Sequence, residues 1–223
     1  DSDLVPPLVG IGEEVPREQY EELFGKVSLS KGEYKHLGAN VRSYVQAIAQ
    51  RAHPHVGTWF PAQWFLENQP GAVLSLKEGA AAWRQFGRLA VFYDVRNPGS
   101  SKILQEIRRA MQQVQKAGSD SGATQGSLEV FIICSLVGGT GAGMAVDIAN
   151  LIKSDERFAA SVRDLVLRGF FVLPRAFGAW ETLDDSSTKQ RARAFAAWRE
   201  LDRFRVPGAV KGLPMQYGPN KLD

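Results

Sequence analysis

The residues best placed to do chemistry are a run of glycines, "GGTGAG" from Gly138 to Gly143, between an apolar stretch and a segment with helical periodicity. A loop that joins a buried strand to a helix presents several backbone N–H groups at the positive end of the helix dipole. Glycine permits positive φ and has no Cβ to hold a phosphate away from those amides. Thr140 adds a hydroxyl donor. Because a charged hydrogen bond contributes roughly 1.5 to 3 kcal/mol, several amides can replace the lysine of other phosphate loops.

Other phosphate-binding motifs fit this run less well. A Walker loop needs Lys and then Ser or Thr after its last glycine, but Gly143 is followed by Met144 and Ala145. The dinucleotide fingerprint G-x-G-x-x-G fails in both frames, because Met144 replaces its last glycine or Thr140 replaces its second. A glycine-rich turn that serves only tight packing of the strand against the helix stays open as the structural alternative.

The elements around the loop form a predicted βαβ unit. The segment "LEVFIICSLV" (128–137) is apolar on both alternating faces, which is typical of a central strand covered on two sides. A second such segment, 164–174, ends on a proline. The helix between them is indicated by apolar residues at helical spacing: Ala145, Ile148, Ala149 and Ile152. This order predicts a parallel α/β sheet with a right-handed crossover.

Three more helices are predicted outside this unit, over 40–52, 97–116 and 186–204. The second has serines able to cap it and an apolar stripe. The third has a candidate buried face of Ala194, Ala197, Trp198, Leu201 and Phe204. After the first comes a segment rich in Pro and Trp, 53–72, which we interpret as a loop. Its His53 and His55 lack a third ligand, so solvated histidines are favoured over a metal site.

Composition limits the class of protein. The chain has 223 residues, 44% hydrophobic and 23% charged, as expected of a soluble globular protein with one core. Its net charge of +3 is too small to predict nucleic acid as a partner. No stretch approaches the ~20 apolar residues of a membrane span. The single Cys134 lies in an apolar run and favours a reducing compartment. We expect a cytoplasmic protein that binds neither nucleic acid nor membrane directly.

The glycine run resembles the signature loop of the tubulin/FtsZ superfamily, GGTG followed by Ser, Thr or Ala and then Gly. Upstream, "GAAAWRQFGR" (79–88) is similar to the family's turn at the terminal phosphate, and "DSDL" (1–4) to the end of its acidic loop near phosphates and metal. Downstream, "FFVLPRAF" (170–177) is similar to the ribose-side loop, although the family's glutamate stands farther along here. The segment 188–204 resembles the divergent bacterial tubulin-like proteins.

The resemblance implies a three-layer, Rossmann-like α/β sandwich with a mainly parallel sheet. It implies a single nucleotide-binding domain over 1–223, with the Pro- and Trp-rich segment around 53–72 as an insertion. The family's first phosphate loop would precede Asp1, and its guanine-contacting helix, acidic loop and second domain would follow Tyr217. We therefore expect a partial GTPase domain that is truncated at both ends.

The family's ligands are GTP or GDP with Mg²⁺, and the resemblance assigns residues to them. The phosphate-binding residues are Gly138, Gly139, Thr140, Gly141, Ala142, Gly143, Gly79, Ala80, Ala81 and Ala82. Pro174 and Glu181 are assigned to the ribose side and Asp3 to the neighbourhood of the magnesium, with no direct metal ligand. Asp147 is more often an exposed residue or a dipole partner than a metal ligand. Arg84 and Arg88 have three alternative interpretations: contact with the γ-phosphate, contact with a neighbouring subunit, or simple solvation.

The resemblance implies a filament-forming GTPase subunit that self-associates and has accessory protein partners. No catalytic residue is assigned in this chain, because in the family the acidic groups that position water come from the next subunit. A degenerate tubulin-like scaffold is the alternative, since bulky Trp83 and Phe86 stand near the alanines and some of the five tryptophans are candidate interface anchors. A NAD-binding Rossmann domain is the third interpretation.

Overall fold

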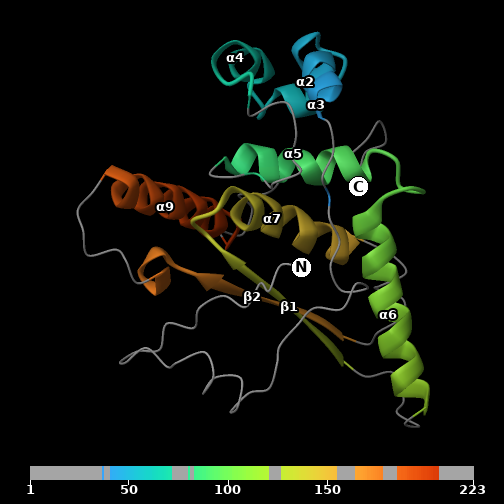
Figure 1. Ribbon diagram of the computed structural model, residues 1–223. Helices are drawn as coiled ribbons and strands as arrows, with labels where there is room; N and C mark the ends of the chain where they lie inside the picture. The colour runs from blue at the N-terminus through green and yellow to red at the C-terminus, as the bar shows by residue number, and fades with distance from the viewer. Residues whose placement is uncertain are drawn as a thin grey trace, which may run out of the picture.

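The computed structural model describes residues 37, 41–71, 80, 83–120, 127–154, 164–177 and 185–205. Its elements in chain order are α2 (Arg42–Ala49), α3 (Pro54–Gly57), α4 (Ala62–Asn68), α5 (Arg84–Val95), α6 (Lys102–Asp120), β1 (Ser127–Ser135), α7 (Gly139–Ser154), β2 (Asp164–Val172), the 3-10 helix η1 (Pro174–Phe177) and α9 (Asp185–Arg205). The mixed α/β class predicted from the sequence is confirmed (Figure 1).

Strands β1 and β2 form a parallel pair connected through α7, so the predicted βαβ unit is confirmed. The register runs from Ser127 opposite Asp164 to Ser135 opposite Val172. Both strands therefore end at the same edge, where the glycine run follows β1 and η1 follows β2. In open α/β sheets, ligands bind at this carboxyl edge.

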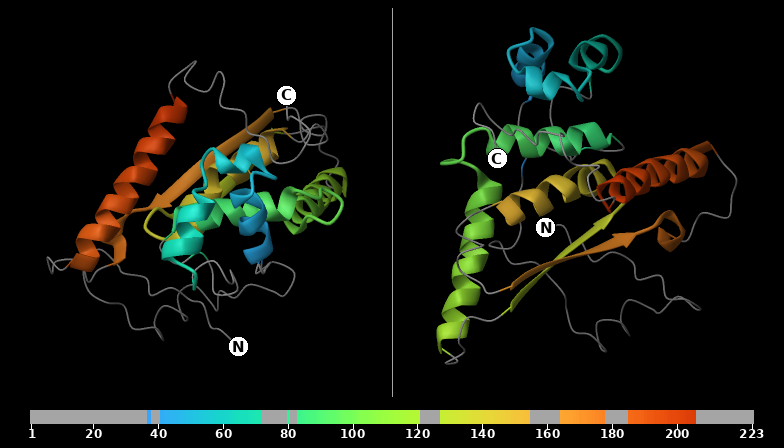
Figure 2. Two further views of the ribbon diagram at one scale, coloured as in Figure 1. Left: turned by 90° about the horizontal axis from the view of Figure 1, so that it is seen from above. Right: turned by 180° about the vertical axis from the view of Figure 1, so that it is seen from behind.

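The helices are arranged in successive layers on one side of this pair (Figures 1 and 2). Helix α7 covers one face of the strand pair, α5 lies on α7, and the short helices α2, α3 and α4 lie beyond α5. On the inner face of the sheet, Leu128 and Leu167 pack against Met111 of α6 and Ile152 of α7. The crossover helix thus lies between the sheet and a second helical layer.

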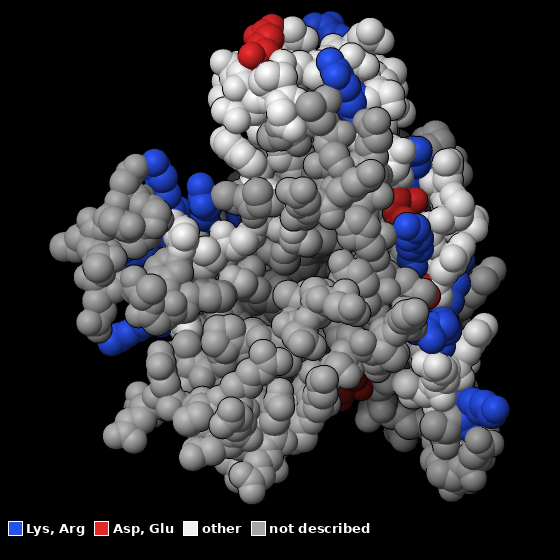
Figure 3. Space-filling model, in the orientation of Figure 1, with Lys and Arg blue, Asp and Glu red and all other residues white. Residues whose placement is uncertain are grey.

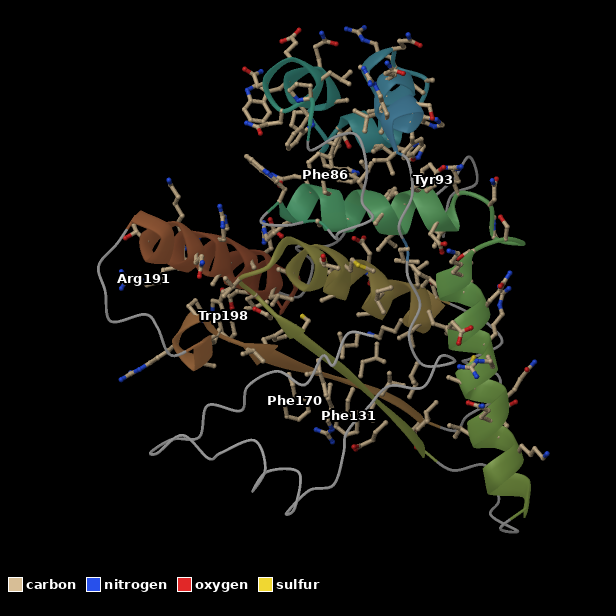
Figure 4. All side chains as sticks on the ribbon, in the orientation of Figure 1. Phe86, Tyr93, Phe131, Phe170, Arg191 and Trp198 are labelled. Atoms are coloured by element: carbon tan, nitrogen blue, oxygen red, sulfur yellow. The ribbon has the colours of Figure 1, made fainter. Side chains whose placement is uncertain are left out.

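The other face of the strand pair is open in the described part of the chain. Phe131, Ile133 and Phe170 are 50%, 71% and 54% exposed. Figure 4 shows Phe131 and Phe170 directed away from α7. The sequence predicted a strand covered on two sides, but the described helices cover only one face. Alternation shows that both faces are apolar, yet it does not show what covers each face.

The Pro- and Trp-rich segment contains two short helices, α3 and α4, so its interpretation as a loop is wrong. Pro54 is the first residue of α3, and Pro61 immediately precedes α4. A proline at these positions loses no intrahelical hydrogen bond, so it starts a helix rather than breaking one. Phe60 stacks on Phe65 with ring centroids 5.1 Å apart, and Phe65 lies 4.7 Å from Phe86 of α5. This aromatic cluster joins α3 and α4 to α5 in the main core.

Helix α6 begins with the serine cap that the sequence predicts. The Leu104 N–H donates to Ser101 Oγ at 3.1 Å, while the Ser101 hydroxyl donates to Asp94 at 2.5 Å. Asp94 also accepts the N–H groups of Lys102 and Ile103 at 3.0 Å. Two side chains therefore satisfy the first turn of α6 and fix it against the end of α5.

Helix α9 packs through its alanines rather than its tryptophan. Ala194 and Ala197 are buried beside Leu136, whereas Trp198 is 48% exposed, which corrects the expectation that it lies in the buried face. The small side chains of the alanines let the backbone of α9 approach the loop after β1. Trp198 lies outside this contact. The predicted buried side chain of Phe204 lies outside the described side chains.

Candidate phosphate-binding loop

The predicted phosphate loop lies at the start of α7. Because α7 begins at Gly139, Gly138 occupies the N-cap position. The N–H groups of a helix's first turn have no intrahelical acceptor and lie at the positive end of its dipole. Thr140 is exposed and Gly138 is half-buried, whereas Gly139 is buried. The loop is thus open to solvent on the side of Gly138 and Thr140.

The residues just before the loop are fixed to the ends of the two strands. The Leu136 N–H donates to the Val172 carbonyl at 3.1 Å, and the Val137 N–H donates to Ser135 Oγ at 3.1 Å. Leu136 is also buried against α9. A ligand at the start of α7 would therefore meet a backbone held by β1, β2 and α9.

The glycines of the loop differ in the space around their Cα atoms. A Cβ on Gly141 would lie 2.8 Å from Cys134 Cβ, and one on Gly143 would lie 2.2 Å from the Arg84 carbonyl oxygen. A Cβ on Gly138 would have no neighbour within 4 Å. None of the three has φ in the left-handed range, so positive φ is not the reason for glycine there. Tight packing explains Gly141 and Gly143, whereas Gly138, of these three, leaves space for a ligand.

Close packing also involves a glycine whose role the sequence analysis missed. A Cβ on Gly87 of α5 would lie 2.3 Å from the Gly139 carbonyl oxygen and 2.9 Å from that of Thr140. Helix α5 begins at Arg84, so Gly87 lies in its first turn. The backbone of α5 thus rests directly on the first turns of α7. In the sequence, the only sign of this close contact is Gly87 itself. A glycine inside a helical pattern is unfavourable unless packing requires it.

The two predicted phosphate segments meet through one hydrogen bond. The N–H of Ala80, which is buried, donates to Thr140 Oγ1 at 3.1 Å. A hydroxyl accepts such a bond and still has its own proton to donate. Thr140 can therefore hold the turn at Ala80 and donate to a ligand at the same time. Gly79, Ala81 and Ala82 lie outside the described residues, and their assignment stays a prediction.

Asp147 is buried in the protein and is not a surface residue, so the expectation of exposure is wrong. Its carboxylate, 2% exposed, accepts from Arg88 Nε at 3.2 Å. The Arg88 guanidinium also lies 4.5 Å above the ring of Trp59. The pair connects α7 to α5 and to the turn between α3 and α4. Among the described residues, no group of three His, Cys, Asp or Glu could hold a metal ion.

Arg84, the first residue of α5, lies close to the first turns of α7. Its guanidinium pairs with Glu200 of α9, and its side chain is 17% exposed. Its carbonyl oxygen lies against Gly143, and Ala197, one turn before Glu200, packs near Ala142. The ion pair therefore lies beside the first turn of α7, so the interpretation of Arg84 as a solvated arginine is wrong.

Of the residues assigned to the ribose side and to the magnesium, the structure describes Pro174. Pro174 begins η1 two residues after the last residue of β2, at the same edge of the sheet as the glycine loop. Glu181 and Asp3 lie outside the described residues, so their assignments stay predictions.

A family model described as tubulin like matches residues 19–222. The chain belongs to the tubulin-like family. The resemblance drawn from the glycine run is confirmed, and the matched span of the tubulin-like chain includes α5, the loop, η1 and α9. No curated protein and no solved structure matches it.

Two further features of this tubulin-like chain concern its helices. None of its described helices has the length and apolarity that crossing a bilayer requires. Lys and Arg side chains follow the edge formed by α6 (Figure 3), where Arg109 pairs with Glu106 at 2.8 Å.

Proposed function

We propose that this tubulin-like chain binds a guanine nucleotide, GTP or GDP with Mg²⁺, at the start of α7. The observation that carries the proposal is the hydrogen bond from the Ala80 N–H to Thr140 Oγ1. It joins the two segments that the family resemblance assigns to the phosphates, although they are far apart in the sequence. Membership of the tubulin-like family supports the same ligand.

Different residues of the proposed site bind different parts of the nucleotide. The N–H groups of residues 138–141 have no acceptor within α7 and face the α- and β-phosphates, whereas those of Ala142 and Gly143 are used within the helix. The open position at Gly138 admits the phosphates without a clash. The Thr140 hydroxyl donates one further hydrogen bond. The family resemblance assigns the segment 79–82 to the γ-phosphate, and Ala80 links it to Thr140. Magnesium would neutralise phosphate charge when bound; the family resemblance assigns Asp3 to its neighbourhood, and Pro174 and Glu181 to the ribose side.

The proposed biological unit is a cytoplasmic filament of such subunits, in which GTP is hydrolysed between neighbours. This chain holds the phosphates, and the acidic groups that position water come from the next subunit. The competing hypothesis is a tubulin-like scaffold that does not bind nucleotide. One observation favours it: packing alone accounts for glycine at 141 and 143. A NAD-binding domain has less support, because the dinucleotide fingerprint is incomplete.

Titration with a fluorescent GTP analogue in Mg²⁺ tests the proposal. We expect saturable binding that GDP displaces, that EDTA weakens, and that NADH leaves unchanged. Absence of binding at high micromolar concentration favours the scaffold, and displacement by NADH favours the dinucleotide interpretation. Gly141→Trp is a poor negative control, because its Cβ would clash with Cys134 and disturb the fold. A substitution at Gly138 avoids that fault.

A sedimentation experiment tests the filament separately. We expect GTP to produce pelletable assemblies and GDP to produce fewer. Nucleotide binding without assembly would remove the filament from the proposal and leave the phosphate site intact.

A further inference from the structure

Arg51 has a backbone conformation that favours glycine. Its φ is 62°, and it is the one non-glycine residue with positive φ in the described part of the chain. It follows α2 in a Schellman motif: the Arg51 N–H donates to the Ile48 carbonyl at 2.9 Å, and the Ala52 N–H donates to that of Ala47 at 2.9 Å. Glycine is the usual residue there because a Cβ is unfavourable in this region. Arg51 therefore adopts this conformation at a cost in stability, and such a strained residue is a candidate for a functional side chain.

The side chain of Arg51 lines an open groove of about 600 Å³ between α2, α3 and α4. Ile48 and Phe60, both buried, form its floor, and Pro61 lies beside them. Trp64 also lines it and is 45% exposed. Figures 1 and 2 show these helices on the side of α5 opposite α7. The groove is therefore separate from the phosphate loop.

The groove combines an apolar surface with one positively charged side chain, that of Arg51. Arg51 is exposed, and its guanidinium forms no ion pair or hydrogen bond with the residues that the structure describes. Among the described lining residues no other is charged, and the polar ones are Thr58 and Gln63. Trp and Arg are the residue types that most often dominate the binding energy of protein interfaces. A ligand that suits this groove has apolar side chains and a carboxylate.

We propose that the groove binds a short acidic segment of a partner protein, in which aromatic or aliphatic residues stand beside Asp or Glu. The apolar side chains lie against Phe60, Pro61 and Trp64, and the carboxylate accepts a bidentate pair of hydrogen bonds from Arg51. The proposal goes beyond nucleotide binding and does not depend on it.

Selection of a phage-displayed random dodecapeptide library on the full chain tests this proposal. We expect enriched peptides that combine aromatic or aliphatic residues with Asp or Glu. The best peptide, labelled with fluorescein, is then titrated by anisotropy. Trp64→Ala is expected to weaken its binding at least about tenfold, as for an interface anchor. Lys153→Ala, at the end of α7, is the matched control and leaves the affinity unchanged.

Arg51→Gly is the sharpest variant, because its two effects have opposite directions. It removes the unfavourable φ, so we expect the melting temperature to rise by about 2–4 °C. It also removes the guanidinium, so the affinity for the acidic peptide should fall at least about fivefold, and Arg51→Lys should lose less. No enrichment, enrichment of basic peptides, or equal binding by Arg51→Gly would overturn the proposal. Self-association of the chain that Trp64→Ala abolishes would assign the groove to a second copy instead.

Discussion

The Ala80 N–H donates to Thr140 Oγ1 at 3.1 Å, across sixty residues of sequence. Ala80 is buried, so its amide has little access to water if that acceptor is lost. The bond fixes the distance between the turn at Ala80 and the start of α7. Any ligand held by both segments therefore depends on Thr140.

Thr140→Val keeps the shape of the side chain and removes the hydroxyl. The Ala80 amide loses its acceptor, so we expect a loss of about 1–2 kcal/mol in the free energy of unfolding. The affinity for GTP should fall by about 10- to 100-fold, because one donor to phosphate is lost as well. Thr140→Ser, which keeps the hydroxyl, is the control. Denaturant unfolding and nucleotide titration measure both effects, and equal affinities for the Val and Ser variants would contradict this role.

Gly143→Ala tests the packing of α5 on α7. Its new Cβ would lie 2.2 Å from the Arg84 carbonyl oxygen, a contact that only a backbone shift relieves. We expect destabilisation by about 1–3 kcal/mol, and the same direction for Gly87→Ala. Gly138→Ala meets no neighbour and should cost no more than about 1 kcal/mol, as a weaker N-cap residue. Urea unfolding of the three variants decides. A Gly138 variant as unstable as the Gly143 variant would be inconsistent with the packing described here.

Periodicity and glycine spacing were enough to predict the βαβ unit, its parallel pairing and the position of the glycine loop. These features depend on residues close together in the sequence. The reason for glycine at 143 lies in α5, and the partner of Asp147 is 59 residues away, so neither could be found from local spacing. Prolines at 54 and 61 suggested a loop, because a proline that starts a helix and one that breaks it look alike in sequence.

The Arg88–Asp147 pair should respond unequally to loss of its two members. Arg88→Leu leaves a carboxylate that is 2% exposed without this partner, and we expect a loss of about 3–5 kcal/mol. Asp147→Leu leaves a guanidinium that is 31% exposed and still lies over Trp59, so the loss should be smaller. The double variant should recover part of the stability. Equal losses in the two single variants, measured by denaturant unfolding, would show that burial of the carboxylate is not the controlling feature.

Cys134 gives a prediction about pH. Burial raises the pKa of its thiol above the ordinary value of 9.0, because the thiolate is less well solvated in the fold. We therefore expect iodoacetamide to alkylate it more slowly than a free thiol near pH 8. A pKa raised in the folded state contributes stability that is full below about pH 9 and is lost as pH rises through the folded pKa. The difference in unfolding free energy between the wild-type chain and Cys134→Ser should thus fall above pH 9. A difference that rises instead would contradict the burial effect.

Gly138→Asp and Gly138→Asn test the central claim most directly, which is that phosphate binds at the start of α7. Both side chains cap helices well, and Asp also suits the helix dipole, so neither variant should unfold more easily than the wild type. Only Asp repels a phosphate. We predict that the dissociation constant for GTP, measured by titration calorimetry, is at least about tenfold higher for the Asp variant than for the Asn variant. This ratio corresponds to about 1.4 kcal/mol of binding free energy. Equal affinity of the Asp and Asn variants for GTP would contradict the account.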